Sequence, residues 1–138
     1  MGTALAPCLE PGMVAYLSGD LGAGKTTLAR GVLRGLGHAG PVKSPSYALL
    51  EPYKLSRLYL YHFDFYRFSD AREAVDAGFR EYFNPDSVCL VEWPENATGM
   101  LPAADLDIRF KVAGSGREVE IYAGTEAGRL CLERTKTR

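Results

Sequence analysis

The sequence predicts a single domain of the α/β class, with a mostly parallel sheet, added antiparallel strands and helices in a three-layer arrangement. Apolar runs of strand length alternate with segments of helical pattern along most of the chain. Two runs of alternating apolar and polar residues then flank a Gly-Ser-Gly turn near the carboxyl terminus. Alternating strands and helices favour a parallel sheet, and the two later runs favour an antiparallel hairpin. Because 138 residues suffice for one core, we expect residues 1–138 to form one domain.

The first half of the chain predicts three strands and one helix. Residues 13–17 form a short apolar strand that enters a glycine-rich turn. A helix follows, because apolar side chains recur at helical spacing until Gly37, a favourable stop. The apolar run at 47–53 is a strand that Pro52 confines to an edge or an end of the sheet. Residues 57–64 are almost continuously apolar or aromatic, which is typical of a strand buried on both faces.

The second half predicts a helix, a strand, a hairpin and a final helix. Residues 69–78 begin with Ser-Asp and end with glycine, which indicates a short helix. Residues 87–93 form the next buried strand. The alternating runs at 106–112 and 117–123 predict a hairpin with one wet face. The tail at 125–138 has a weak helical period, and we expect a short helix there.

Composition excludes several classes of function. The formal net charge is −1, so the chain offers no broad basic surface for nucleic acid or an anionic membrane, and any role with nucleic acid is expected to be indirect. The apolar runs are too short for a membrane span, and the amino terminus lacks the pattern of a signal peptide. We therefore expect a cytoplasmic protein. Cys8, Cys89 and Cys131 are odd in number and lack metal-ligand spacing, so we expect buried, reduced thiols.

One motif carries a defined chemistry. Eight consecutive residues match the phosphate-loop pattern G-x-x-x-x-G-K-[ST], namely Gly19, Asp20, Leu21, Gly22, Ala23, Gly24, Lys25 and Thr26. Glycines let successive backbone N–H groups turn toward phosphate oxygens, and the helix that follows adds its positive end. Lys25 is expected to reach the β- and γ-phosphates, the Thr26 hydroxyl to ligate Mg²⁺, and Thr27 to lie near the α-phosphate.

Two acids accompany this loop. Asp64 and Glu92 each end an apolar strand, and both are expected to emerge at the carboxyl edge of the sheet, where ligands bind in open α/β folds. A nucleotide triphosphatase needs an acid there to hold Mg²⁺ and to orient the attacking water. We assign Glu92 to the metal and Asp64 to the water, although the pattern leaves the reverse assignment open.

Other residues near these motifs are candidates of a weaker kind. Ser44 and Ser46 lie in the loop after the phosphate-loop helix, where segments that sense the γ-phosphate often occur. Trp93 directly follows Glu92, where an aromatic side chain usually packs in or beside the core but can also stack on a base or contact a partner. We assign it to the nucleotide site. His62 lies within an apolar strand, and we expect it to be a packing residue of the core.

These motifs together resemble one family. The segments GDLGAGKTT, KSPSYALLEPY, YHFDFYR and CLVEWPE, in this order and spacing, are similar to those of the bacterial TsaE (YjeE) family. The resemblance covers nearly the whole chain. It implies a P-loop NTPase-like fold and an ATPase that uses ATP and Mg²⁺ in making threonylcarbamoyladenosine (t6A) at adenosine 37 of tRNA. It also implies TsaD and TsaB as partners, through which tRNA is reached indirectly.

The resemblance also assigns residues. Lys25, Thr26, Asp64, Glu92 and Trp93 match the functional motifs, and Ser46 matches a switch hydroxyl that is usually threonine in the family. The family usually begins with a strand and a full helix before the phosphate-loop strand, so we expect this chain to begin inside that helix.

Two other functions would use the same loop. A small-molecule kinase would pass the γ-phosphate to a hydroxyl and usually carries an arginine-bearing lid, and no arginine-rich insertion of that length is present. A GTP-operated switch would need an Asn-Lys-x-Asp guanine reader, which the sequence lacks. The kinase remains the alternative to the ATPase, and acceptor-dependent turnover would distinguish it.

Overall fold

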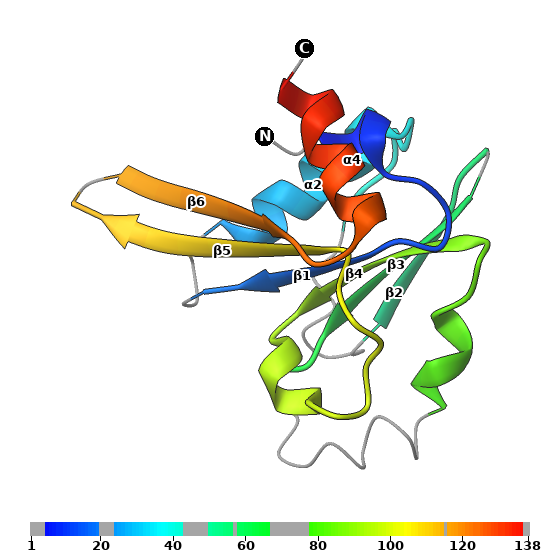
Figure 1. Ribbon diagram of the computed structural model, residues 1–138. Coiled ribbons are helices and arrows are strands. Elements are labelled where there is room, and N and C mark those ends of the chain that lie inside the picture. Colours follow the sequence, from blue (N-terminus) through cyan, green and yellow to red (C-terminus); the bar gives the residue numbers. More distant parts are fainter. Residues whose placement is uncertain are drawn as a thin grey trace.

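The computed structural model of the chain (Figure 1) describes residues 5–19, 24–42, 50–56, 58–66, 78–114 and 116–136. Within these residues, six strands form one sheet in the order β2-β3-β4-β1-β5-β6. The strands β3, β4, β1 and β5 run parallel, and β2 and β6 add to the two edges in antiparallel fashion. The predicted fold class, a mostly parallel sheet with antiparallel additions, is confirmed.

The predicted first strand and the predicted helix after the glycine-rich segment are both present. Strand β1 spans Val14–Ser18, and helix α2 spans Lys25–Gly35. One side of α2 is buried against the sheet because its apolar residues recur every three or four positions, at Leu28, Ala29, Val32 and Leu33. The predicted stop at Gly37 has φ of 98°, a left-handed conformation that glycine adopts without steric cost.

The strands β2 (Leu50–Lys54), β3 (Tyr59–Asp64) and β4 (Ser87–Glu92) match the three predicted apolar runs. Pro52 lies in β2, which is an edge strand as its proline requires. All six residues of β4 are buried, because β4 lies between β3 and β1 and both of its faces are covered. The helix predicted at 69–78 lies outside the described residues except for Gly78, so that prediction remains untested.

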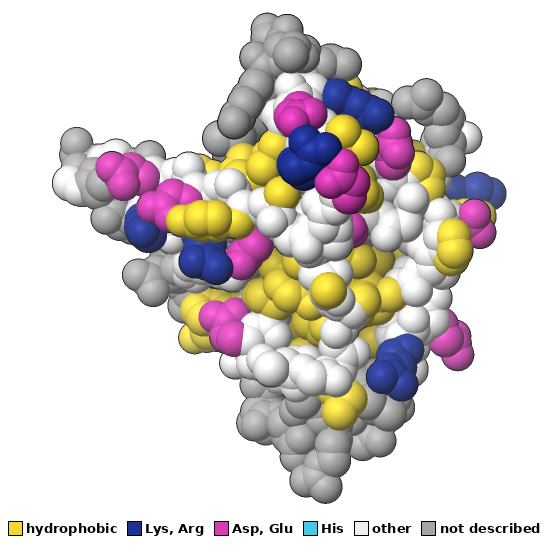
Figure 2. Space-filling view, in the orientation of Figure 1, with side chains coloured by type: hydrophobic (Ala, Val, Ile, Leu, Met, Phe, Trp, Pro, Cys, Tyr) yellow, Lys and Arg dark blue, Asp and Glu magenta, His cyan; other side chains and the backbone are white. Residues whose placement is uncertain are grey.

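The carboxyl-terminal third forms the predicted hairpin and helix. Strands β5 (Leu106–Ala113) and β6 (Gly116–Ala123) pair antiparallel along their whole length, and helix α4 (Glu126–Lys136) follows. The Thr125 hydroxyl accepts a hydrogen bond from the Gly128 N–H and so caps α4. Acidic and basic side chains are interspersed over α4 and the hairpin on the face shown in Figure 2.

Two apolar clusters lie on opposite faces of the sheet and form the outer layers with the helices. One cluster packs α2 and α4 against alternate residues of the strands, such as Leu17, Leu90 and Ile108. The other contains Phe63, Val91 and residues of two short 3₁₀ helices, η2 (Phe79–Tyr82) and η3 (Pro94–Ala97). No helix in the described part of the chain is long and apolar enough to cross a membrane.

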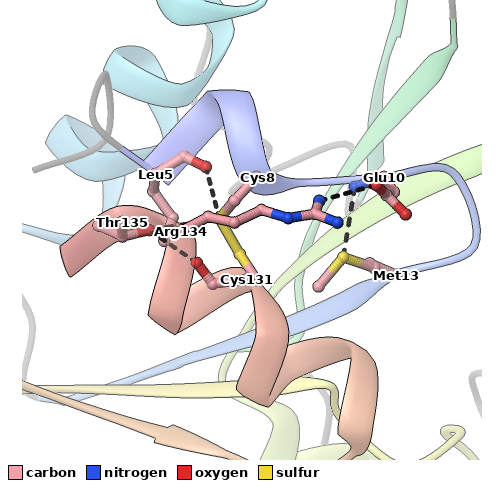
Figure 3. A network of polar contacts seen from close by, with 7 residues as sticks. All are labelled: Leu5, Cys8, Glu10, Met13, Cys131, Arg134 and Thr135. Atoms are coloured by element: carbon pink, nitrogen blue, oxygen red, sulfur yellow. Dashed lines mark hydrogen bonds and ion pairs between the residues drawn. A yellow bond between two sulfur atoms is a disulfide. The ribbon is translucent and has the colours of Figure 1, made fainter. Parts of the chain in front are cut away.

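The expectation of three reduced cysteines is wrong for two of them. Cys8, at the end of the 3₁₀ helix η1 (Ala6–Cys8), forms a disulfide with Cys131 of α4 (Figure 3). The pairing was not predictable from spacing because 123 residues separate the two cysteines, and only the packing of η1 on α4 brings them together. Cys89 of β4 is free and buried, as expected, and burial raises the pKa of its thiol to about 12.

Candidate functional site

The two acids predicted at strand ends lie side by side. Asp64 is the last residue of β3 and Glu92 is the last residue of β4, and the register of the two parallel strands pairs them directly. Both side chains are buried, with 7% and 4% of the residue exposed, respectively. Parallel strands place their carboxyl ends at one edge of the sheet, so Gly19 after β1 and the two acids that end β3 and β4 lie at the same edge.

Lys25 reaches this edge from the first turn of α2. Its Nζ donates a hydrogen bond to the carbonyl oxygen of Gly19 (2.7 Å) and lies 3.9 Å from the centre of the Trp93 ring. The lysine is 4% exposed, which is unusual for an ammonium group. The ring of Trp93 faces the cation and contributes a cation–π interaction. The Lys25 ammonium group, at the start of α2, therefore contacts both Gly19 after β1 and Trp93 after β4.

The backbone at both ends of the loop requires glycine. Gly19 has φ of 140°, and a Cβ on it would lie 2.6 Å from the carbonyl oxygen of Phe110. Gly24, which precedes α2, has φ of 105°. No described side chain caps α2 and its first turn carries no acid, so the helix begins with N–H groups suited to an anion.

His62 also belongs to this site, which the sequence interpretation missed. Its side chain is fully buried, as expected, but its Nε2 lies 2.5 Å from Oε2 of Glu92. Alternation along β3 places His62 and Asp64 on the same face of the sheet. The spacing His-x-Asp was the available signal, because residues two apart on a strand share a face.

The site concentrates the buried polar groups of the protein. Of the five buried polar or charged side chains in the described residues, four lie here, namely Lys25, His62, Asp64 and Glu92. Burial raises the pKa of Asp64, and the nearby Glu92 carboxylate raises it further. Hydrogen bonding from the Tyr66 N–H and the charge of Lys25 oppose the increase in this pKa. Such a cluster costs stability, and it is typical of a functional site.

Hydrogen bonds connect the chain segments that leave β3 and β4. The Phe65 N–H donates to the Glu92 carbonyl oxygen (3.0 Å), and the Asn96 amide donates to the Phe65 carbonyl oxygen (2.9 Å). The Tyr66 and Trp93 rings lie 5.1 Å apart, centre to centre. Trp93 has φ of 57°, and it is the only described non-glycine residue with positive φ. This strained backbone conformation is held by its neighbours, as often occurs at functional sites.

The other predicted site residues divide into two groups. Thr26 is half-buried and Thr27 is exposed, both in the first turn of α2. Asp20, Leu21, Gly22, Ala23, Ser44 and Ser46 lie outside the described residues. The structure thus brings together Gly19, Gly24, Lys25, Asp64, Glu92 and Trp93, and it adds His62, Tyr66 and Asn96 to them.

The side chains present are suited to a nucleotide with Mg²⁺. Mg²⁺ prefers oxygen ligands and is usually bound by one or two carboxylates together with phosphate oxygens. Asp64, Glu92 and the Thr26 hydroxyl offer such oxygens. No group of three or more His, Cys, Asp or Glu residues in the described chain could hold a metal by itself. A metal here would therefore be bound jointly by protein and phosphate oxygens.

This combination of fold and site defines a class. A strand and a helix that presents a buried lysine, joined by a glycine-rich sequence and lying beside acids on neighbouring parallel strands, are the parts of a P-loop NTPase-like protein. Within that class, the chain belongs to the TsaE family. Its residues 1–119 match the family model described as threonylcarbamoyl adenosine biosynthesis protein TsaE.

Individual relatives agree with the family match. The chain is 48% identical over 120 residues to the tRNA threonylcarbamoyladenosine biosynthesis protein TsaE of Haemophilus influenzae, covering 87% of this chain and 76% of the relative. It is 44% identical over 126 residues to the Bacillus subtilis protein of the same name, covering 90% and 78%. The crystal structure of Bacillus subtilis YdiB superimposes with a TM-score of 0.84 at 35% identity, covering 99% of this chain and 84% of that chain.

Proposed function

We propose that this chain is an ATPase that binds ATP with Mg²⁺ and hydrolyses it slowly in support of t6A modification at adenosine 37 of tRNA. The observation that supports ATP hydrolysis best is the register pair of Asp64 and Glu92 beside the buried Lys25. The name of the family and of its relatives supports the role in t6A biosynthesis.

The phosphate-binding part comprises the loop and the start of α2. Backbone N–H groups of residues 19–24 and the amino terminus of α2 would bind the phosphates. The Lys25 ammonium would leave the Gly19 carbonyl oxygen to contact the β- and γ-phosphates. The Thr26 hydroxyl would be a metal ligand, and Thr27 would lie near the α-phosphate. Bound Mg²⁺ would supply positive charge to the phosphates during transfer.

The hydrolytic part comprises the ends of β3 and β4. Glu92 would orient the metal's water shell, and Asp64 would position the attacking water. Trp93 would contact the nucleotide once Lys25 has moved off its ring. Ser46, in the loop that follows α2, would supply the switch hydroxyl.

The chain is proposed to act in the cytoplasm as one domain with TsaD and TsaB as partners, and to reach tRNA only through them. Lys25 is the only buried Lys or Arg among the described residues, so the described part offers no buried arginine beside the acids. Without an arginine to stabilise charge in the transition state, turnover by the isolated chain is expected to be slow. A partner could supply that charge or improve positioning.

The test separates binding from turnover. Lys25→Ala should abolish ATP binding, whereas Glu92→Gln and Asp64→Asn should retain binding and lose most of the phosphate release. Lys54→Ala is a matched control, because Lys54 is an exposed lysine on β2. Wild-type phosphate release by both acid variants would refute the assignment. Turnover that requires a hydroxyl acceptor and transfers phosphate to it would favour the kinase alternative.

A further inference from the structure

We propose that His62 is a positioning residue for Glu92, which holds this carboxylate in one orientation at the phosphate site. The inference rests on the proposed ATPase function and adds a role that the motifs do not assign. Its basis is the contact between Nε2 of His62 and Oε2 of Glu92, at 2.5 Å between two buried side chains.

The strand register explains why His62 can serve Glu92. His62 pairs with Leu90 across the two parallel strands, and Glu92 lies two residues further along β4 on the same face. The imidazole therefore reaches along the strand direction to the carboxylate at the strand end. The position of the imidazole is itself restricted, because His62 is fully buried and its strand, β3, is paired on both sides, with β2 and with β4.

The proposed role also specifies which ring nitrogen carries hydrogen. It requires Glu92 to act as a carboxylate, which only accepts hydrogen bonds, so Nε2 of His62 is the donor. Nδ1 is buried and has no partner among the described residues. In the neutral ring this nitrogen is then a bare acceptor, and no buried N–H is left without a partner.

The bond restricts Glu92 where orientation matters. A glutamate has three side-chain torsions, and a carboxylate that must orient a metal-bound water loses rate when it can rotate away. With Oε2 engaged by His62, Oε1 is the oxygen that we assign to the water shell. Supporting hydrogen bonds of this kind typically change activity or metal affinity by about 10- to 100-fold when removed.

The first experiment replaces the donor in two ways. His62→Leu removes it at similar volume, and His62→Gln supplies an amide N–H that can still reach Glu92. We expect His62→Leu to lower kcat for ATP by about 10- to 100-fold with little change in KM. His62→Gln should recover most of the kcat that His62→Leu loses. Equal kcat values for wild type and His62→Leu would overturn the inference.

A stability control and a double-mutant cycle exclude a merely structural role. Val88→Ala removes two methyl groups from a fully buried side chain of β4, four residues before Glu92, and it should lower stability while keeping kcat. In the Glu92→Gln background, His62→Leu should cause no further loss of kcat, because His62 acts through Glu92. Independent, multiplicative losses would overturn the inference.

Two further measurements separate this inference from the proposed function. The chain has only two histidines, so ¹⁵N spectra can assign the ring hydrogens of His62 without any assay of turnover. A hydrogen on Nε2 supports the inference, and a bare Nε2 overturns it. A wild-type chain that binds ATP but releases no phosphate would refute the ATPase. In that case the role of His62 would be tested by measuring how strongly ATP affinity depends on Mg²⁺. We expect His62→Leu to weaken this dependence, and an unchanged dependence would overturn the inference.

Discussion

Lys25 of α2 contacts Trp93 at the end of β4, with Nζ 3.9 Å from the centre of the indole ring. The residues come from segments that are 68 positions apart in the sequence (93 minus 25) and meet only because β1 and β4 are neighbours in the sheet. The same Nζ donates to the Gly19 carbonyl oxygen. Under the proposed function, the ammonium group of Lys25 must leave the Gly19 carbonyl oxygen when phosphate binds.

The first prediction uses Trp93 as a reporter, since it is the only tryptophan in the chain. ATP should change its fluorescence emission in a saturable way, because the phosphates draw the ammonium group of Lys25 off the indole ring. Lys25→Met should abolish this response by removing both the cation and ATP affinity. Titration of wild type with no change in emission, at ATP concentrations where calorimetry detects binding, would contradict the prediction.

The second prediction concerns the cost of burying Asp64. The folded-state pKa of this carboxyl is raised, chiefly by burial, so its ionised form is destabilised in the folded protein near neutral pH. Asp64→Asn should therefore increase the free energy of unfolding at pH 7, even though it impairs catalysis. Denaturant unfolding of both proteins measures the difference.

The pH dependence of this gain has a definite sign. A carboxyl with a raised folded-state pKa costs stability above that pKa, and the cost disappears as pH falls through it toward the unfolded value of 3.8. The gain in free energy of unfolding from Asp64→Asn should decrease as pH falls through this range and vanish below pH 3.8. A gain of equal size at every pH would contradict the electrostatic explanation.

The third prediction compares two glycines that both have positive φ. Gly19→Ala should be strongly destabilising, because its Cβ would lie 2.6 Å from the Phe110 carbonyl oxygen in addition to the backbone strain. Gly37→Ala is the matched control, with φ of 98° and no atom within 4 Å of the added Cβ, and it should cost only about 1–2 kcal/mol. Thermal unfolding would measure both. Equal losses would show that the contact with Phe110 is absent.

The fourth prediction counts thiols. The native protein should react slowly with alkylating reagents, because Cys89 is buried with a raised thiol pKa and the other two cysteines are bonded. Unfolding without reductant should expose one thiol, and unfolding with reductant should expose three. Three thiols without reductant, in protein kept under oxidising conditions, would contradict the bond between Cys8 and Cys131.

Breaking the disulfide should also lower stability. The bond closes a span of 123 residues between η1 and α4, and removing a native disulfide typically costs about 2–5 kcal/mol. Cys8→Ser should therefore unfold at a lower denaturant concentration than wild type under oxidising conditions. The denaturant midpoints of the two proteins should become similar when reductant is present. The loss of stability of the wild type on reduction then measures the contribution of the disulfide.

The elements could be predicted because their signals are local. The strands that end at Asp64 and Glu92 are apolar runs closed by an acid, and the hairpin is marked by alternation around Gly114. The phosphate loop was recognisable from its glycines and Lys25. Each of these signals extends over fewer than about twenty residues, close to the range within which hydrophobic periodicity is informative.

Contacts between elements could not be predicted in the same way. The side-chain contact between His62 and Glu92 depends on the register between β3 and β4, which no local pattern specifies. The bond between Cys8 and Cys131 depends on the packing of η1 on α4, and an odd number of cysteines gave no reason to expect a pair. Sequence reasoning therefore found the acids but not the histidine that contacts one of them.

The measurement that tests the central claim most directly is ATP hydrolysis by this chain, alone and with TsaD and TsaB, with Glu92→Ala assayed beside it. The proposed function predicts slow phosphate release by the isolated chain, faster release with the partners, and loss of both in the variant. Phosphate release that is absent from wild type, or that is unaffected by both the partners and the substitution, would contradict an ATPase that serves tRNA modification.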